Sequence, residues 1–284
     1  MEQSQRVSSA ASFIIQSPPG EINDIISDLR TIVDDDEALQ TGIQPALEGY
    51  NKEQFVCVTV PGQEHQVIVS DAGLIQESGR FLDPRSRTSF VFDHLSLTAT
   101  DPEPVEANTE AEPFRLALEE STLRYLSEFF QEGVTSVFTS TSKSNTYIIQ
   151  IVANKYNPQN FWSGRWRSEY IVDIDNGEIT GKIFVNVHYY EQGNVQLQTT
   201  YTPNLTLPSS LTPSSAPKIL AIIAEKEGEH ERALSNAYGD LGEKTFKSLR
   251  RALPLTRQKL DWDKVLGYKL GAELAASRGA FGSS

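Results

Sequence analysis

A late stretch of the chain, TFKSLRRALPLTRQKLDW, concentrates cationic side chains. Lys247, Arg250 and Arg251 are spaced at i, i+3 and i+4, so a helix would place all three on one face. Arg257 and Lys259 follow a few residues later. Clustered ammonium and guanidinium groups are suited to binding an anionic partner, and this stretch is therefore the first candidate binding site.

The rest of the chain has the opposite charge. The 284 residues include 25 Lys and Arg against 38 Asp and Glu, a net charge of −13. Residues 244–284 contain nine basic and three acidic residues, a net +6, which leaves −19 for residues 1–243. A polyanionic partner is therefore expected to meet the C-terminal segment, because the remainder repels it.

A second helical pattern, DWDKVLGYKLGAEL, follows the cationic stretch. Trp262, Leu266 and Leu270 fall on one side of it. Gly267 and Gly271 each weaken such a helix by roughly 1 kcal/mol relative to alanine. We therefore expect this amphipathic segment to lean on another surface.

Catalytic and metal-binding patterns are not found. GEITGK lacks the spacing and the Ser or Thr of a phosphate-binding loop, and no G-x-G-x-x-G follows a predicted strand. The four histidines show no paired metal-ligand spacing, and Cys57 has the apolar neighbours of a core thiol. We expect no catalytic residue, no metal and no cofactor, and hence no enzyme.

The composition predicts a cytosolic protein. The chain has no run of about 18 apolar residues and no secretory leader at its N-terminus. A single cysteine excludes an internal disulfide and fits a reducing compartment.

The hydrophobic periodicity predicts an α+β fold. It indicates N-terminal helices, one of them in PPGEINDIISDLRTIVDDD, and then short strands over residues 54–98. The acidic run DPEPVEANTEAEP, residues 101–113, has no periodicity and is interpreted as a flexible surface insertion rather than a folded element. A helix is predicted over residues 114–130.

The segment from residue 145 to 201 alternates with period two and predicts an antiparallel meander sheet. One face of its second strand carries Trp166 and Tyr170, and the other carries Arg165 and Arg167. Helices must cover the apolar face, and a long helix is predicted to begin near Pro217. Its expected inner stripe comprises Ile219, Ile222, Ile223, Lys226, His230, Ala233, Leu234 and Ala237, with an acidic exposed face from EKEGEHE.

The motif NPQNFWSGRWRSEY gathers two tryptophans and two arginines within six positions. One interpretation is structural: the rings fill the core and the arginines pair with carboxylates. The other is a direct binding surface.

Three motifs together resemble one family. PPGEINDIISDLRTIVDDD, NFWSGRWRSEY and FKSLRRALPLTRQKLDWDKVLGYKLG occur in the order and at the spacing of the alpha subunit of F-actin-capping protein. The resemblance implies an obligate heterodimer with a beta subunit of similar fold, whose central sheet joins that of the alpha subunit. It implies calcium-independent capping of filament barbed ends in the cortical actin cytoskeleton, without nucleotide or metal.

The resemblance also implies site residues. Lys247, Arg251 and Arg257 match the family's basic actin contacts, and the same patch would meet phosphoinositide head groups. The family's amphipathic "tentacle" falls on residues 261–274, so the actin-binding set expected here is Lys247, Arg250, Arg251, Arg257, Lys259, Trp262, Leu266 and Leu270. The chain would then divide into a body, residues 1–243, and a basic segment with tentacle, residues 244–284.

Two other classes of protein remain open. A nucleic-acid-binding module is disfavoured by the net charge of −13 and by the lack of aromatic residues interleaved with the cations. A cytosolic scaffold or adaptor without capping activity is the second alternative.

Overall fold

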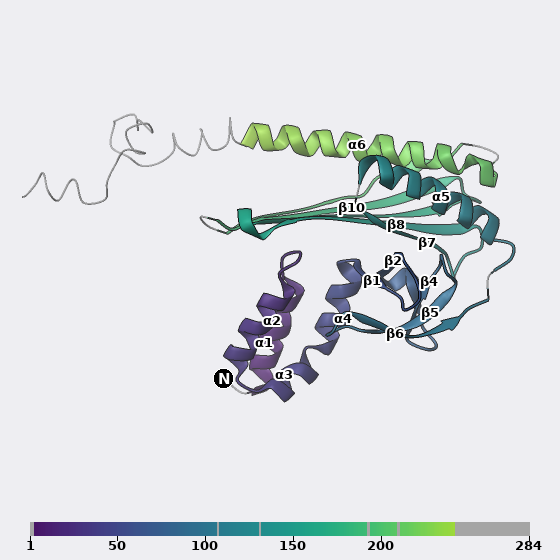
Figure 1. The fold of residues 1–284 in the computed structure, drawn as a ribbon. Coiled ribbons are helices and arrows are strands. Elements are labelled where there is room, and N and C mark those ends of the chain that lie inside the picture. Colours follow the sequence, from purple (N-terminus) through teal and green to yellow (C-terminus); the bar gives the residue numbers. More distant parts are fainter. Residues whose placement is uncertain (1–2, 107, 131, 192–193, 209–210, 242–284) are drawn as a thin grey trace, which may run out of the picture. The chain divides into compact units, whose positions relative to one another are not determined.

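The computed structural model describes residues 3–106, 108–130, 132–191, 194–208 and 211–241 (Figure 1). The chain divides into two compact units, Met1–His230 and Glu231–Ser284, and only residues 231–241 of the second unit are described.

The chain begins with a bundle of four helices. They are α1 (Gln3–Ile15), α2 (Ile22–Val33), α3 (Asp36–Gly42) and α4 (Gln44–Glu53). The helix predicted in PPGEINDIISDLRTIVDDD is confirmed as α2, whose Leu29 and Val33 are buried in one cluster with Ile14 of α1 and Leu39 of α3. This small apolar core holds the bundle together.

Two small antiparallel sheets follow and confirm the predicted strand region. The first pairs β1 (Val56–Thr59) with β2 (Gln66–Val69), and the second has the order β3 (Leu74–Ile75), β4 (Arg80–Asp83), β5 (Thr88–Asp93) and β6 (Thr98–Pro104). A short 3-10 turn, η1 (Asp71–Gly73), precedes β3.

The prediction that residues 101–113 form no folded element is wrong at both ends. Asp101 to Pro104 belong to β6, and α5 (Glu112–Phe129) begins before the predicted residue 114. Opposite charges explain the difference, because Arg80 lies 2.8 Å from Asp101 and Arg87 lies 3.0 Å from Glu112. These arginines come from other segments, so the acidic run alone does not reveal them.

The predicted meander is confirmed as the central sheet. Its strand order is β11-β10-β9-β8-β7, with β12 also paired to β10. The strands are β7 (Val134–Thr139), β8 (Thr146–Asn157), β9 (Trp162–Asp173), β10 (Glu178–Tyr189), β11 (Val195–Tyr201) and β12 (Asn204–Thr206), and η2 (Pro158–Asn160) joins β8 to β9. The turn between β9 and β10 contains Gly177 at φ +68°, a conformation that glycine adopts without strain.

The two faces of this sheet differ as predicted. One face places Ile149, Tyr170 and Ile183 in a core shared with Leu118 of α5 and Ile219 of α6 (Ala216–Asp240) (Figure 1). The other face is largely polar, and part of it is covered by a small apolar cluster that includes Val152 of β8. The helix α6 follows η3 (Pro213–Ser215).

The inner stripe of α6 is predicted correctly only in part. Ile219 and Ile223 are buried as expected, but Ala233 and Ala237 are exposed. Glu227, which the sequence assigned to the exposed acidic face, is 3% exposed. It lies four residues after Ile223 and therefore continues the buried stripe.

Candidate functional site

The residues predicted to bind actin lie outside the described part of the chain. They are Lys247, Arg250, Arg251, Arg257, Lys259, Trp262, Leu266 and Leu270, all within residues 242–284. Their roles, and the predicted boundary between residues 243 and 244, therefore stay predictions. The described residues define the body from which that segment continues.

The tryptophan–arginine motif has a structural role in β9. Trp166 packs against the core formed with α5 and α6, with its ring 6.0 Å from that of Phe130. Trp162 lies under the ammonium group of Lys155, which is 5.8 Å from its ring centre. Trp166 therefore fills the core as the structural interpretation predicts, whereas Trp162 is half-buried and belongs to none of the core clusters of the described residues.

The expected partners of the two arginines are wrong. Arg167 is 2% exposed and donates a hydrogen bond to the carbonyl oxygen of Glu53. Arg165 donates to the side-chain oxygen of Asn154 at 2.6 Å and to the carbonyl oxygen of Gln54 at 3.2 Å. Both arginines thus bind carbonyl and amide oxygens where carboxylates were expected, and they fix the end of α4 to the sheet.

Burial lowers the pKa of both guanidinium groups, that of Arg167 to about 10. The cause is desolvation of a charge whose hydrogen-bond partners are neutral dipoles. Because these contacts join segments that are distant in the sequence, we assign both arginines a structural role in the body.

The edge strand β11 is the clearest candidate interaction surface of the body. In the described part of the chain it pairs with β10 on one side and with no strand on the other. Its sequence, VQLQTTY, contains no charge and no proline, and Val195 is 64% exposed. Natural edge strands usually carry charges, prolines or bulges that prevent pairing with another chain. An edge without them is suited to accept a further strand.

The second unit offers an apolar helical stripe. Within its described residues, Leu234, Tyr238 and Leu241 recur at i, i+4 and i+7. Tyr238 is 46% exposed and Leu241 is 42% exposed. An apolar stripe of this kind is typical of a surface that another protein covers.

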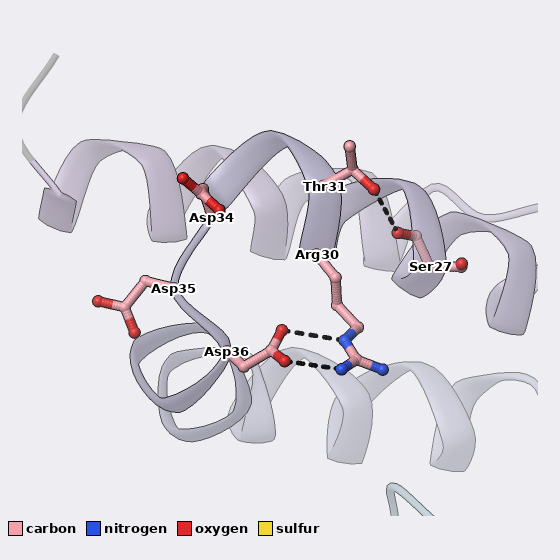
Figure 2. A pocket seen from close by; sticks show the side chains of 6 residues that line it. All are labelled: Ser27, Arg30, Thr31, Asp34, Asp35 and Asp36. Carbon is pink, nitrogen blue, oxygen red and sulfur yellow. Dashed lines mark hydrogen bonds and ion pairs between the residues drawn. The ribbon is translucent and has the colours of Figure 1, made fainter.

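A hollow between α2 and α3 is lined by three aspartates and one arginine. Figure 2 shows its lining residues, among them Arg30, which donates two hydrogen bonds to Asp36 at 2.9 and 2.6 Å. The hydrogen bond from Arg30 lowers the pKa of Asp36, and Asp35 caps α3 by accepting from the backbone of Ala38. Asp36 thus connects α2 and α3 through Arg30. Among the described residues no cluster of His, Cys, Asp and Glu has the geometry to hold a metal ion.

Glu227 is a buried carboxyl group that the sequence did not reveal. It accepts hydrogen bonds from the hydroxyl groups of Tyr170, at 2.7 Å, and of Tyr125. Burial raises the pKa of Glu227. Glu227 therefore joins α6 to α5 and to β9 through one group. Its position on the stripe begun by Ile219 and Ile223 is the signal that could have indicated this.

We expect Glu227→Gln to remove part of the pH dependence of stability. The pKa of Glu227 is higher in the folded than in the unfolded protein, so the free energy of unfolding falls as pH rises from the ordinary glutamate pKa through the folded one. The amide cannot ionise, so the loss of stability above the ordinary glutamate pKa should be smaller in the variant than in the native chain. Urea unfolding at several pH values measures this difference.

The matched control is Glu225→Gln, which removes a carboxyl group from an exposed position on the same helix. Its stability should change with pH in parallel with that of the native chain. Parallel curves for Glu227→Gln as well would contradict the assignment of a buried, ionisable Glu227.

Among the helices of the described residues, none combines the length and the apolar character that a membrane span requires.

Comparison with known proteins gives a consistent result. The model of the F-actin capping protein alpha subunit family matches residues 10–273. The F-actin-capping protein subunit alpha of Emericella nidulans is 38% identical over 95% of this chain and 97% of its own length. That of Caenorhabditis elegans is 35% identical over 95% and 97%.

A solved structure supports the fold. The homodimeric actin capping protein alpha subunit from Plasmodium berghei matches with a TM-score of 0.65 at 20% identity, over 85% of this chain and 94% of that one. Together with the sequence matches, which extend over nearly the whole chain, this establishes that the chain belongs to the F-actin capping protein alpha subunit family.

Proposed function

We propose that this chain is the alpha subunit of a heterodimeric F-actin capping protein, which binds filament barbed ends without calcium and blocks the exchange of subunits. The observation that carries the proposal is the family match, which extends from residue 10 to residue 273 and so includes the cationic stretch and all but the last residue of the predicted tentacle. The chain acts by occupying a surface and carries out no chemical reaction.

The proposed partner of the body is a beta subunit. The uncharged edge strand β11 supports this, because pairing with a strand of the partner would continue the sheet. The stripe of Leu234, Tyr238 and Leu241 supports it independently, since it is apolar and its last two side chains are exposed. The Plasmodium relative is homodimeric, so a second copy of this chain is the alternative occupant.

The proposed actin contacts are the cations and apolar residues of the C-terminal segment. Lys247, Arg251 and Arg257 would steer and orient the cap on the acidic surface of actin. The apolar side of the predicted tentacle helix would occupy a groove on actin through Trp262, Leu266 and Leu270. Arg250 and Lys259 add to the positive field.

Phosphoinositides are proposed as competitors at the same cations. A polyanionic head group and actin would both be attracted to Lys247, Arg251 and Arg257, so the lipid would release the cap. The proposed location is the cytoplasm, in the cortical actin cytoskeleton.

Co-expression with a beta subunit and a seeded elongation assay test the proposal. The chain should co-purify with the beta subunit, and the complex should stop growth from barbed-end seeds at concentrations far below that of actin, with and without a calcium chelator. Unchanged elongation rates would contradict it. Purification of the chain alone as a stable dimer would favour the second copy as partner.

The scaffold alternative predicts a different pattern. A scaffold would pair with the beta subunit and leave elongation unchanged at all concentrations. The same assay therefore separates the two proposals, and filter binding with single- and double-stranded DNA tests the nucleic-acid-binding class.

A further inference from the structure

The hairpin turn between β9 and β10 contains Asn176 followed by Gly177, the only asparagine–glycine pair in the chain. Asn176 is exposed. A Cβ atom built on Gly177 would meet no other described atom within 4 Å, so no neighbouring group shields that side of the turn. Asparagine–glycine pairs are common in hairpin turns, where glycine supplies the positive φ. The same pair is also chemically reactive.

The reaction joins the backbone nitrogen of Gly177 to the side-chain amide carbon, Cγ, of Asn176. As the new N–Cγ bond forms, the Cγ–Nδ2 bond breaks, and Nδ2 leaves as ammonia with the proton that the Gly177 nitrogen gives up. The product is a five-membered succinimide ring. Water then opens the ring at one of two carbon atoms. Opening at Cγ leaves an aspartate, whereas opening at the backbone carbonyl carbon leaves an isoaspartate, in which the main chain runs through the former side chain.

Two features of the turn leave the nucleophile accessible. Glycine has no side chain to shield its nitrogen, whereas every other residue has a Cβ atom next to it. Within the described part of the chain, moreover, no hydrogen bond engages the backbone N–H of Gly177. The electrophilic carbon belongs to an exposed side chain, so the two reacting groups lie at the surface.

The carboxylate of Asp173 restrains the reacting side chain. Its Oδ2 atom accepts from Nδ2 of Asn176 at 2.9 Å, and its Oδ1 atom accepts from the backbone nitrogen of the same residue at 3.0 Å. The first hydrogen bond directs the side-chain amide back along the chain, away from Gly177. It must therefore open before Cγ can reach the nitrogen of Gly177.

We propose that Asn176 is a site of spontaneous deamidation, that Asp173 slows the reaction, and that the isoaspartate product loosens the attachment of β12. The carbonyl oxygen of Gly177 accepts a hydrogen bond from the backbone nitrogen of Leu207, directly after β12, at 2.8 Å. Isoaspartate lengthens the backbone of the turn by one carbon atom, which displaces this carbonyl group from Leu207. This inference requires neither actin nor a particular partner subunit.

Mass spectrometry of the full-length chain, in the assembly in which it purifies, tests the site. Cleavage after Arg167 and Lys182 gives a peptide of residues 168–182, in which Asn176 is the only asparagine. During incubation at mildly alkaline pH, the aspartate and isoaspartate forms of this peptide should accumulate together. Asn160 is the control in the same sample, because it is exposed but is followed by Phe161, and it should remain an amide.

Two substitutions test the role of Asp173. In Asp173→Ala the hydrogen bond to a charged group is lost, so the conversion rate should rise about tenfold. Lys143→Ala is the matched control, because Lys143 pairs with the same carboxylate but not with Asn176. Its conversion rate should stay within a few-fold of the native one. Should Asp173→Ala fail to fold, Asp173→Asn removes the charge and should also react faster than the native chain.

Hydrogen exchange on the converted protein tests the structural effect. Peptides covering residues 203–207 should exchange faster in samples rich in isoaspartate than in fresh protein. Asn176→Asp carries the new charge on a normal backbone, so its exchange in these peptides should stay close to that of fresh protein. Equal exchange in fresh and converted protein would overturn the proposed loosening of β12.

Three other outcomes would contradict the proposal. The site itself is overturned if peptide 168–182 stays unchanged while a synthetic peptide of the same sequence converts. Equal conversion at Asn160 would show that the asparagine–glycine turn has no special reactivity. An unchanged or slower reaction in Asp173→Ala would overturn the restraining role of Asp173.

Discussion

Replacing Lys247, Arg251 and Arg257 together by glutamate is expected to weaken barbed-end capping by about 100-fold or more. The change reverses three charges where the net positive charge of residues 244–284 is only +6, so that segment becomes neutral. Electrostatic attraction to the acidic filament end is then lost. The association rate constant should therefore change more than the dissociation rate constant. Seeded elongation at several concentrations of the complex, repeated at two salt concentrations, measures the effect.

The control reverses an equal charge elsewhere. Arg6, Arg124 and Lys218 are exposed residues of the described body, and their joint replacement by glutamate changes the net charge by the same amount. Arg124 pairs with Glu120 on the solvent side of α5, where an ion pair contributes little to stability. This control complex should cap within a few-fold of the native one. Equal loss in both variants would show that net charge matters and the named cations do not.

Replacing Gln198 and Thr200 by lysine is expected to prevent assembly with the beta subunit. Both side chains are exposed on the polar face of β11, so the isolated chain tolerates the change. In a continuous sheet, the two ammonium groups would lie beside the partner strand, and lysines on an edge strand oppose pairing with another strand. Two such lysines should therefore weaken the heterodimer by about 100-fold or more.

Analytical ultracentrifugation of the co-expressed subunits measures this loss. Thr180→Lys adds a lysine to the same face of the sheet, at an exposed position of β10 that already has neighbours on both sides, and should leave assembly unchanged. Exchange of the side chains for other uncharged ones, as in Gln198→Thr with Thr200→Gln, should also be tolerated. Full assembly of the lysine variant would contradict a role for the β11 edge.

Sequence periodicity predicts best those helices and strands whose own pattern of apolar and polar residues is sufficient to assign them. The α2 helix and the meander follow from spacings of about 3.6 and 2, and the alternation around Trp166 and Arg167 assigns the two faces of β9 correctly. Family motifs extended this prediction to the C-terminal segment, which composition alone identifies only as cationic. Local pattern is sufficient where one face of an element is apolar throughout.

Prediction from sequence failed where a polar residue has a distant partner. Glu227 was assigned to solvent because it is charged, although its tyrosine partners are 57 and 102 residues away. Arg167 binds a backbone carbonyl group 114 residues distant, and the acidic run near residue 101 is ordered by Arg80. A buried polar group needs a hydrogen-bond partner. Which residue supplies that partner depends on the tertiary fold, so the residue type alone does not predict such pairs.

The most direct test of capping is to watch single growing filaments after adding the full-length chain assembled with a beta subunit. Barbed ends are expected to stop growing once the complex has bound, while pointed ends continue to exchange subunits. Growth at the barbed end should resume only when the complex dissociates. Barbed ends that keep growing with the complex bound, or a complex bound along filament sides, would contradict it.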